Sequence, residues 1–251
     1  MSPTYDDDLG LTVEVPHVVN RVVSLVPSLT ESIAVTAPGL LVGATDWCTH
    51  PADLDVVRIG GTKNPRVDAV VALRPDVVVT NEEENRAADL DAMRAAGLAV
   101  WVTAPTTVGD ALRSLDRMLT VACHLDRPSW LDEAATAWAM PDATKHRAIV
   151  PIWRRPWMAL GRDTFAGDVL ARLGIENVLR DNAERYPRID LDALPPHDLV
   201  VLPDEPYAFG ADDGPEAFPD VEVRCVSGRH LTWYGPSLVE ARAVLTTQLY
   251  S

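Results

Sequence analysis

The sequence predicts an α/β protein of two lobes, each with a parallel sheet, joined by a helical segment. Short runs rich in β-branched residues alternate with helical stretches, which is typical of parallel sheets. One phrase occurs twice, as DAVVALRPDVVVTNEE at 68–83 and LDALPPHDLVVLPDE at 191–205. An amphipathic stretch separates the two copies. We therefore predict an N-terminal lobe at 1–106, a helical linker at 107–144 and a C-terminal lobe at 145–251.

The first lobe begins with the apolar run RVVSLV at 21–26, which reads as a strand ending at Pro27. Ser28 and Glu31 have the spacing of a capping box, so a helix is expected to start there. A charged, alanine-rich helix at 82–96 should end at Gly97. The other elements expected in this lobe are strands at 41–45, 77–80 and 98–103 and a helix at 67–73.

The linker and the second lobe follow the same logic. Residues 107–121 place Val108, Leu112, Leu115, Met118 and Leu119 on one helical face, and 128–140 form a second helix stopped at Pro141. The second lobe is expected to contain strands at 148–153, 198–202 and 221–226 and helices at 165–173 and 236–248.

The formal net charge of −15 disfavours binding to nucleic acid and to anionic membranes. No apolar run approaches the length of a membrane-spanning helix, so membrane insertion is not expected. The first twenty residues lack the pattern of a secretory signal. Three widely spaced cysteines do not suggest a disulfide framework. These features together predict a cytoplasmic protein.

Ligands of open parallel sheets bind beyond the carboxyl ends of the strands. In a two-lobed protein this places the ligand between the lobes. Tryptophan gathers at or near these strand ends, and its large flat face suits a big planar ligand, although each ring could instead fill the interior. The tryptophans and the tyrosine concerned are Trp47, Trp101, Trp153, Trp157, Trp233 and Tyr234, of which Trp101 reads as core.

Five segments occur in an order that resembles the periplasmic-binding-protein-like family with a helical backbone. They are RVVSLVPSLTE, LVGATDWCTHP, GGTKNPRVDAVVALRPDVVVT, GRDTFAGDVLARLGIENVL and TWYGPS. This family includes the cobalamin, haem and ferric-siderophore receptors of ABC importers. The resemblance covers about 18–250 and implies two Rossmann-like lobes joined by one long helix, the class III periplasmic-binding-protein-like fold, with a bound ligand and no hydrolytic chemistry.

The resemblance also implies roles for particular residues. Trp47 falls where the cobalamin binder places an aromatic ring, Thr62 or Lys63 near another contact, and Trp153 near an aromatic of the second lobe. Asp68 falls where importers carry an acid that docks on the permease, whereas a second docking acid is not evident. The residues predicted to bind the ligand are Pro27, Ser28, Trp47, Thr62, Lys63, Asn64, Glu82, Trp153, Arg154, Trp157, Arg162, Trp233 and Tyr234.

Lys63 is one of only two lysines among 22 basic residues, which suggests a role facing an anionic or carboxamide edge of the ligand. Arg154 and Arg162 could meet an anionic edge or pair with surface acids. Cys48 and His50 stand two residues apart and could ligate a metal or a corrinoid or haem axially. The alternative is a buried thiol and a hydrogen-bonded loop histidine.

We therefore predict a non-enzymatic binding protein for a corrinoid, with haem or another metal chelate next. The alternative is a cytoplasmic enzyme or a cofactor- or metal-handling factor that uses Cys48 and His50. A third possibility is a scaffold with a vestigial cleft. The predicted partner is a small molecule, and docking on an ABC permease rests on Asp68.

Overall fold

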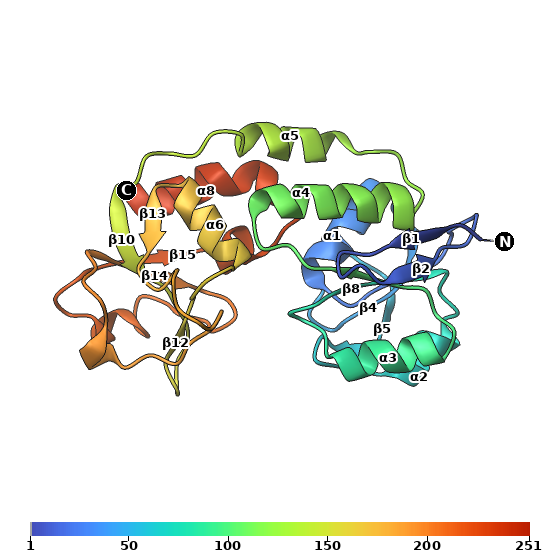
Figure 1. The fold of residues 1–251 in the computed structure, drawn as a ribbon, viewed down its shortest axis with the longest axis horizontal. Helices are drawn as coiled ribbons and strands as arrows, with labels where there is room; N and C mark the ends of the chain where they lie inside the picture. Colours follow the sequence, from blue (N-terminus) through green and yellow to red (C-terminus); the bar gives the residue numbers. More distant parts are fainter. Residues whose placement is uncertain (1) are drawn as a thin grey trace. The chain divides into compact units, whose positions relative to one another are not determined.

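The computed structural model describes residues 2–251, which form two compact units. The chain passes between them several times, and its course can be followed by colour in Figure 1. The predicted range 1–106 lies in unit 1 except for Thr106, whereas the predicted linker is divided between the units. Unit 1 comprises the residues up to Pro105, Ala111–Asp132 and Tyr234–Pro236, and unit 2 comprises Thr106–Asp110, Glu133–Trp233 and Ser237–Ser251.

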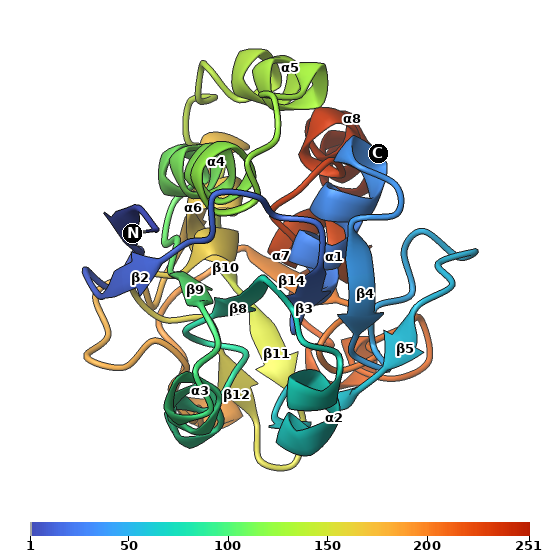
Figure 2. The ribbon, with the colours of Figure 1, turned by 90° about the vertical axis from the view of Figure 1, so that its right-hand side faces the viewer.

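A five-stranded sheet forms the centre of unit 1, and all of its pairings are parallel, as predicted. The strands follow the order β5-β4-β3-β8-β9 across the sheet (Figure 2). All five residues of β8 are buried, which explains its unbroken apolar run. The strands are β3 (Val22–Ser24), β4 (Leu41–Ala44), β5 (Val57–Arg58), β8 (Val77–Asn81) and β9 (Val100–Thr103).

Two predicted helix starts in unit 1 are wrong. The first helix begins at Pro27 without a side-chain cap, because proline itself supplies the helical φ and needs no hydrogen-bond acceptor for an N–H group. The helix predicted from Glu82 begins only at Ala87, because Glu82–Arg86 form a turn. The helices are α1 (Pro27–Thr36), α2 (Val67–Ala72) and α3 (Ala87–Ala95).

Unit 1 also contains two hairpins that the sequence analysis missed. Strands β1 (Thr4–Asp6) and β2 (Thr12–Glu14) pair antiparallel, as do β6 (Gly60–Gly61) and β7 (Asn64–Pro65).

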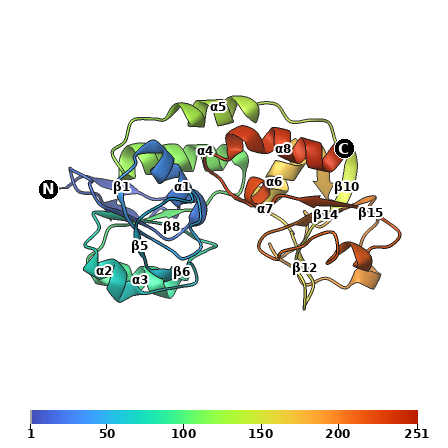
Figure 3. The same ribbon diagram turned by 180° about the vertical axis from the view of Figure 1, so that it is seen from behind.

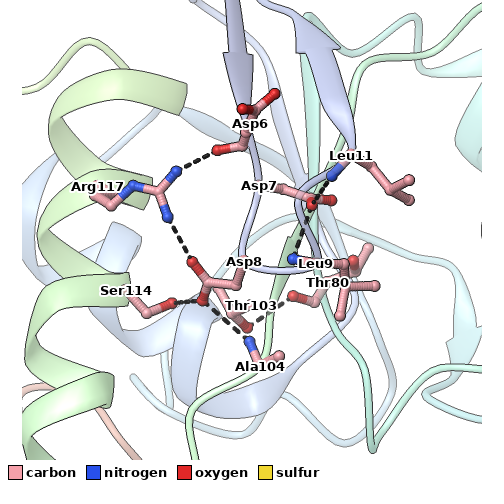
Figure 4. A network of polar contacts seen from close by, with 10 residues as sticks. All are labelled: Asp6, Asp7, Asp8, Leu9, Leu11, Thr80, Thr103, Ala104, Ser114 and Arg117. Atoms are coloured by element: carbon pink, nitrogen blue, oxygen red, sulfur yellow. Dashed lines mark hydrogen bonds and ion pairs between the residues drawn. The ribbon is translucent and has the colours of Figure 1, made fainter.

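Asp8, just after β1, joins the first hairpin to its surroundings (Figure 4). Its carboxylate accepts hydrogen bonds from the Ala104 amide at 3.1 Å, from Ser114 and from the Arg117 guanidinium at 2.9 Å. Its amide donates to the carbonyl of Val102 in the edge strand β9. The hairpin therefore covers part of that edge.

The predicted linker is two helices rather than one. Helix α4 (Val108–Arg117) continues as one π-helical stretch, η1 (Met118–Ala122), and the chain is then irregular until α5 (Ser129–Ala137). The expected apolar face is confirmed, since Val108, Leu115 and Leu119 are buried.

A four-stranded parallel sheet in the order β13-β10-β14-β15 forms the centre of unit 2. Helix α8 contacts β15 (Figure 3). The single strand predicted at 148–153 is wrong: β10 ends at Ile149, and β11 separates to pair antiparallel with β12. Pro151 starts β11, and its missing N–H cannot continue the first ladder. The strands are β10 (His146–Ile149), β11 (Pro151–Trp153), β12 (Met158–Ala159), β13 (Ile175–Asn177), β14 (Leu199–Pro203) and β15 (Glu222–Val226).

The helices of unit 2 are short apart from the last. Thr164 caps α6 by accepting a hydrogen bond from the Gly167 amide at 3.2 Å. In residues 2–251, no helix combines the length and the apolar character needed to cross a membrane. The helices are α6 (Phe165–Arg172), α7 (Gly228–Thr232) and α8 (Leu238–Tyr250), with 3₁₀ turns η2 (Leu191–Ala193) and η3 (Pro215–Ala217).

Candidate functional site

Asn81, at the end of β8, organises the carboxyl edge of the unit 1 sheet. Its side-chain oxygen accepts hydrogen bonds from the amides of Glu83 at 2.8 Å and Glu84 at 3.1 Å. Its side-chain nitrogen donates to the Thr103 carbonyl at 3.0 Å and to the Tyr234 hydroxyl at 2.7 Å. The turn after β8 is therefore held by a side chain that is only 5% exposed.

Asn85 extends this network to the neighbouring loops. Its side-chain oxygen accepts from the Asn81 amide at 2.9 Å, and its nitrogen donates to the carbonyls of Thr62 at 2.9 Å and Leu25 at 3.3 Å. Sequence reasoning missed both asparagines. The signal was present in NEEEN (81–85), where two amides flank the acids directly after a buried strand.

The loop around Lys63 lies beside this turn. The Lys63 ammonium is exposed and donates to the carbonyl of Glu83, so its contact is with the protein backbone. Gly60 has φ +92, and a Cβ at Gly61 would lie 2.5 Å from the Asn64 side-chain oxygen, so both glycines permit a tight turn. Trp47 is 67% exposed, near this turn.

The other residues predicted in unit 1 divide between surface and interior. Glu82 and Asn64 are exposed and Thr62 is half-buried, whereas Pro27 and Ser28 are buried at the start of α1. Tyr234 is 5% exposed, and its hydroxyl also contacts that of Thr103 at 2.9 Å. Burial raises the pKa of this phenol well above its usual range. Tyr234 therefore braces the interior of unit 1, contrary to the prediction that it faces a ligand.

Cys48 and His50 do not share one surface. Cys48 is fully buried, and its thiol lies 3.0 Å from the Thr30 hydroxyl and 3.1 Å from that of Thr45. Burial raises the pKa of this thiol and so disfavours the thiolate that would bind a metal. His50 Nδ1 lies 3.2 Å from the Thr49 hydroxyl. No group of three or more His, Cys, Asp or Glu side chains within residues 2–251 is arranged to hold a metal ion.

Thiol reactivity tests this placement. Cys225 is exposed, whereas Cys48 and Cys123 are buried and burial raises the pKa of Cys123 to about 12. We expect Ellman's reagent to titrate one thiol in the native protein and all three after denaturation. Cys225→Ser should abolish the native reaction. Rapid labelling of Cys48 in the folded protein would contradict the buried placement.

Unit 2 carries a group of aromatic side chains beside the ends of β11 and β14, here called the aromatic surface. Trp157 stacks on Phe209 with ring centroids 5.8 Å apart and planes 7° apart, and Tyr207 lies 4.6 Å from Phe209. Trp153 packs edge-on against Tyr207 at 5.7 Å and is 43% exposed. The surface thus has packed inner rings and an accessible outer ring.

Arg154 lies against this surface and is engaged by two acids. Its guanidinium forms ion pairs with Asp213 and with Glu216, the latter at 2.6 Å, and lies 5.2 Å from the Trp157 ring centroid. The Tyr207 hydroxyl donates to Asp213 at 2.7 Å. The bond from Tyr207, with Arg154, lowers the pKa of Asp213 below its usual value, so this carboxylate stays charged.

The remaining residues predicted in unit 2 have local partners. Trp233 is half-buried and donates its indole N–H to Glu205 at 3.0 Å. Arg162 is exposed and lies 3.5 Å from Asp163. The structure therefore brings Trp153, Arg154 and Trp157 together, and it does not place Arg162 or Trp233 among the contacts of that group described above.

A separate cavity of about 270 Å³ lies along α6 and β13 in unit 2. None of the predicted ligand residues lines it. Its Asp168 accepts hydrogen bonds from the Val108 amide and Arg172, both at 2.8 Å, and its Asn177 donates to the carbonyls of Leu160 and Gly161. Since these polar groups serve the fold, we place the candidate site at the strand ends instead.

Serine, histidine and glutamate side chains form a hydrogen-bonded row at α7. His230 Nδ1 lies 2.8 Å from the Ser227 hydroxyl, and His230 Nε2 lies 3.2 Å from Glu240. The amide of Gly228, however, donates to Asp204, and that of Ser227 donates to Gln248. These adjacent donors are therefore not available to stabilise an oxyanion, which acyl transfer requires.

The acid predicted for docking, Asp68, lies exposed in the first turn of α2, before β8. In unit 2, Asp190 stands at the matching place and caps the 3₁₀ turn η2 before β14. The sequence analysis missed Asp190, although the internal repeat could have located it. Aligning the two copies at Asp76 and Asp198 matches Asp68 with Asp190.

The family model for "Periplasmic binding protein" matches residues 22–195. The vitamin B12-binding protein of Vibrio parahaemolyticus is 22% identical over 207 residues, covering 78% of this chain and 74% of that protein. The periplasmic vitamin B12 binding protein BtuF of Vibrio cholerae superposes with a TM-score of 0.74 at 18% identity, covering 92% of this chain and 96% of that one. The periplasmic heme-binding protein BhuT, in complex with two hemes, gives a TM-score of 0.72 at 21% identity, with 91% and 97% covered.

These two structures share the fold, and the family model spans more than half of the chain. The chain belongs to the periplasmic binding protein family.

Proposed function

We propose that this chain is a non-enzymatic binding protein for a corrinoid, with haem or another metal chelate as the next candidates. The observation that carries the proposal is the aromatic surface of unit 2, where Trp153 presents an exposed ring supported by packed rings beneath it. A large flat ligand gains most of its affinity from burying such apolar area. The relatives named for vitamin B12 binding support a corrinoid first.

Unit 1 is proposed to contribute Trp47 and the loop of Thr62–Asn64. Trp47 is the most exposed aromatic ring among the large apolar side chains named as exposed, and Asn81 and Asn85 hold the neighbouring turn in place. A surface that is rigid before binding loses less conformational entropy when a ligand arrives. The position of the ligand between the lobes remains a prediction from the sequence.

The test is a tryptophan-fluorescence titration with cyanocobalamin, haem and a ferric siderophore. We expect saturable quenching by the corrinoid, and Trp153→Ala should weaken its binding about 30-fold, because a buried aromatic anchor is worth about 2 kcal/mol. Isothermal titration calorimetry would measure the same loss without relying on fluorescence.

Met140→Ala is a matched control, since Met140 is 75% exposed and lies outside both surfaces. Its affinity should equal that of the unsubstituted protein. An absence of binding to every member of the panel would refute the proposal. Equal affinity in Trp153→Ala would instead remove the aromatic surface from the site.

The alternative of an enzyme or metal-handling factor gains no support from Cys48, whose thiol is buried between two threonine hydroxyls. Docking on an ABC permease is proposed through Asp68, with Asp190 as the matching acid in unit 2. Binding of Asp68→Ala and Asp190→Ala proteins to importer-containing membranes would test it. A cytoplasmic location is likewise a proposal, and cell fractionation would decide it. The acidic charge supports a small molecule over nucleic acid as partner.

A further inference from the structure

The cation nearest the aromatic surface is neutralised within the protein. Arg154 is held by Asp213 and by Glu216 at once, and its side chain is only 19% exposed. Glu216 is itself held by the Gly214 amide, which donates to it at 2.6 Å. Asp213 is bound by the Tyr207 hydroxyl. This cluster of one guanidinium and two carboxylates therefore carries a net negative charge.

The cations of the unit 1 loops are occupied as well. The Lys63 ammonium donates to the Glu83 carbonyl. Arg58 donates to the carbonyls of Thr45 at 3.0 Å, Cys48 at 2.8 Å and Leu54 at 3.3 Å. Next to them the turn at 82–84 adds three acidic side chains. An anionic ligand edge would therefore have to displace internal partners before it met a cation on this side.

Two further arginines do not reverse this balance. Arg155 neighbours Arg154 and is exposed, but Asp212 and Asp213 lie in the facing loop that contributes the ion pair. Arg162 is exposed and lies 3.5 Å from Asp163. Exposed ion pairs in water contribute little energy, so neither arginine offers the desolvated contact that strong anion binding uses.

We infer that the chain selects a ligand without net negative charge, and that Asp213 and Glu216 set this selectivity by occupying Arg154. The inference rests on the proposed function and deepens it. A carboxylate placed on the aromatic surface would lose its hydration and meet a guanidinium already shared by two carboxylates. A neutral amide edge carries a smaller desolvation cost. Among the proposed ligands this favours a corrinoid with amide side chains over a dicarboxylate tetrapyrrole.

The experiment compares cyanocobalamin with its derivative in which one peripheral amide is a carboxylate, so that the two ligands differ in charge at one group. We expect the acid to bind at least about tenfold more weakly. In the double variant Asp213→Asn, Glu216→Gln, the acid should gain about tenfold in affinity, while cyanocobalamin changes little. Equal or tighter binding of the acid by the unsubstituted protein would overturn the inference.

The matched control is Asp212→Asn, Asp220→Asn. It removes two charges from exposed acids of the same part of the chain and leaves both ion pairs of Arg154 in place. The acid should remain disfavoured in this variant. If the control restores binding of the acid as fully as the first variant, total charge rather than Arg154 sets the selectivity, and the role of Asp213 and Glu216 is lost.

A second pair of ligands separates this inference from the corrinoid proposal. If neither corrinoid binds, the proposed ligand is wrong, and a tetra-anionic and a tetra-cationic water-soluble porphyrin are compared instead. Preference for the anionic porphyrin would overturn the inference, and preference for the cationic one would support it.

Labelling with phenylglyoxal tests the state of Arg154 without any ligand. We expect Arg154 to react more slowly than exposed Arg162 and to become reactive in Asp213→Asn, Glu216→Gln. Fast reaction of Arg154 in the unsubstituted protein would show that its guanidinium is free, and the inference would fail.

Discussion

Replacing Asn81 by alanine is expected to lower the free energy of unfolding by about 3 kcal/mol, because the substitution removes a buried amide that makes four hydrogen bonds. The amides of Glu83 and Glu84 would lose their acceptor, and the turn after β8 would lose its anchor. Denaturation by urea, followed by circular dichroism, measures the change. For a chain of this length the melting temperature should fall by roughly 6–12 °C.

Asn182→Ala is the matched control. The Asn182 side chain accepts a hydrogen bond from the Glu184 amide at 2.9 Å, so it resembles Asn81 locally, but this bond is exposed. Water can replace the lost partner, and the expected change is below about 0.5 kcal/mol. A similar loss of stability in both variants would show that the buried network around Asn81 adds nothing beyond the local turn.

Replacing Gly161 by alanine is the second large effect expected. A Cβ at this position would lie 2.1 Å from the Glu184 carbonyl oxygen and 2.9 Å from Pro187 Cδ. The close approach is held by the hydrogen bond from the Gly161 amide to the Arg185 carbonyl at 2.7 Å. Because the nearest obstacle is backbone, the loop must move, and we expect a loss of about 3 kcal/mol in the free energy of unfolding.

Gly210→Ala supplies the control, since no atom lies within 4 Å of its added Cβ. Its stability should stay within about 0.5 kcal/mol of the unsubstituted protein. Thermal unfolding monitored by calorimetry compares the two variants. A Gly161→Ala protein as stable as Gly210→Ala would mean that the loop at 184–187 yields at little cost.

The fold was largely predictable because its signals are local. The buried strand β8 shows itself as an apolar run, and the face of α4 shows itself by spacing. The false helix start at Glu82 has a physical cause. Acids favour a helix N-terminus, but here the side chains of Asn81 and Asn85 hold the backbone in a turn, and such side-chain bonds compete with the helix.

The candidate site was predictable only in part. The tryptophans near strand ends could be named from the order of elements, and Trp153 and Trp157 do gather in one group. The partners of the charged residues could not. Arg154 pairs with Asp213, which is 59 positions away, and Lys63 contacts the carbonyl of Glu83, 20 positions away. Such pairings depend on how loops meet after folding, which residue type and spacing do not encode.

The membership of Tyr234–Pro236 in unit 1, between two stretches of unit 2, has a consequence for the order of biosynthesis. A ribosome completes the unit 1 sheet long before it reaches Tyr234. Until then the side chains of Asn81 and Thr103 lack their bonds to the tyrosine hydroxyl. Unit 1 therefore matures only after almost all of unit 2 has been made, and no single cut of the chain releases both units whole.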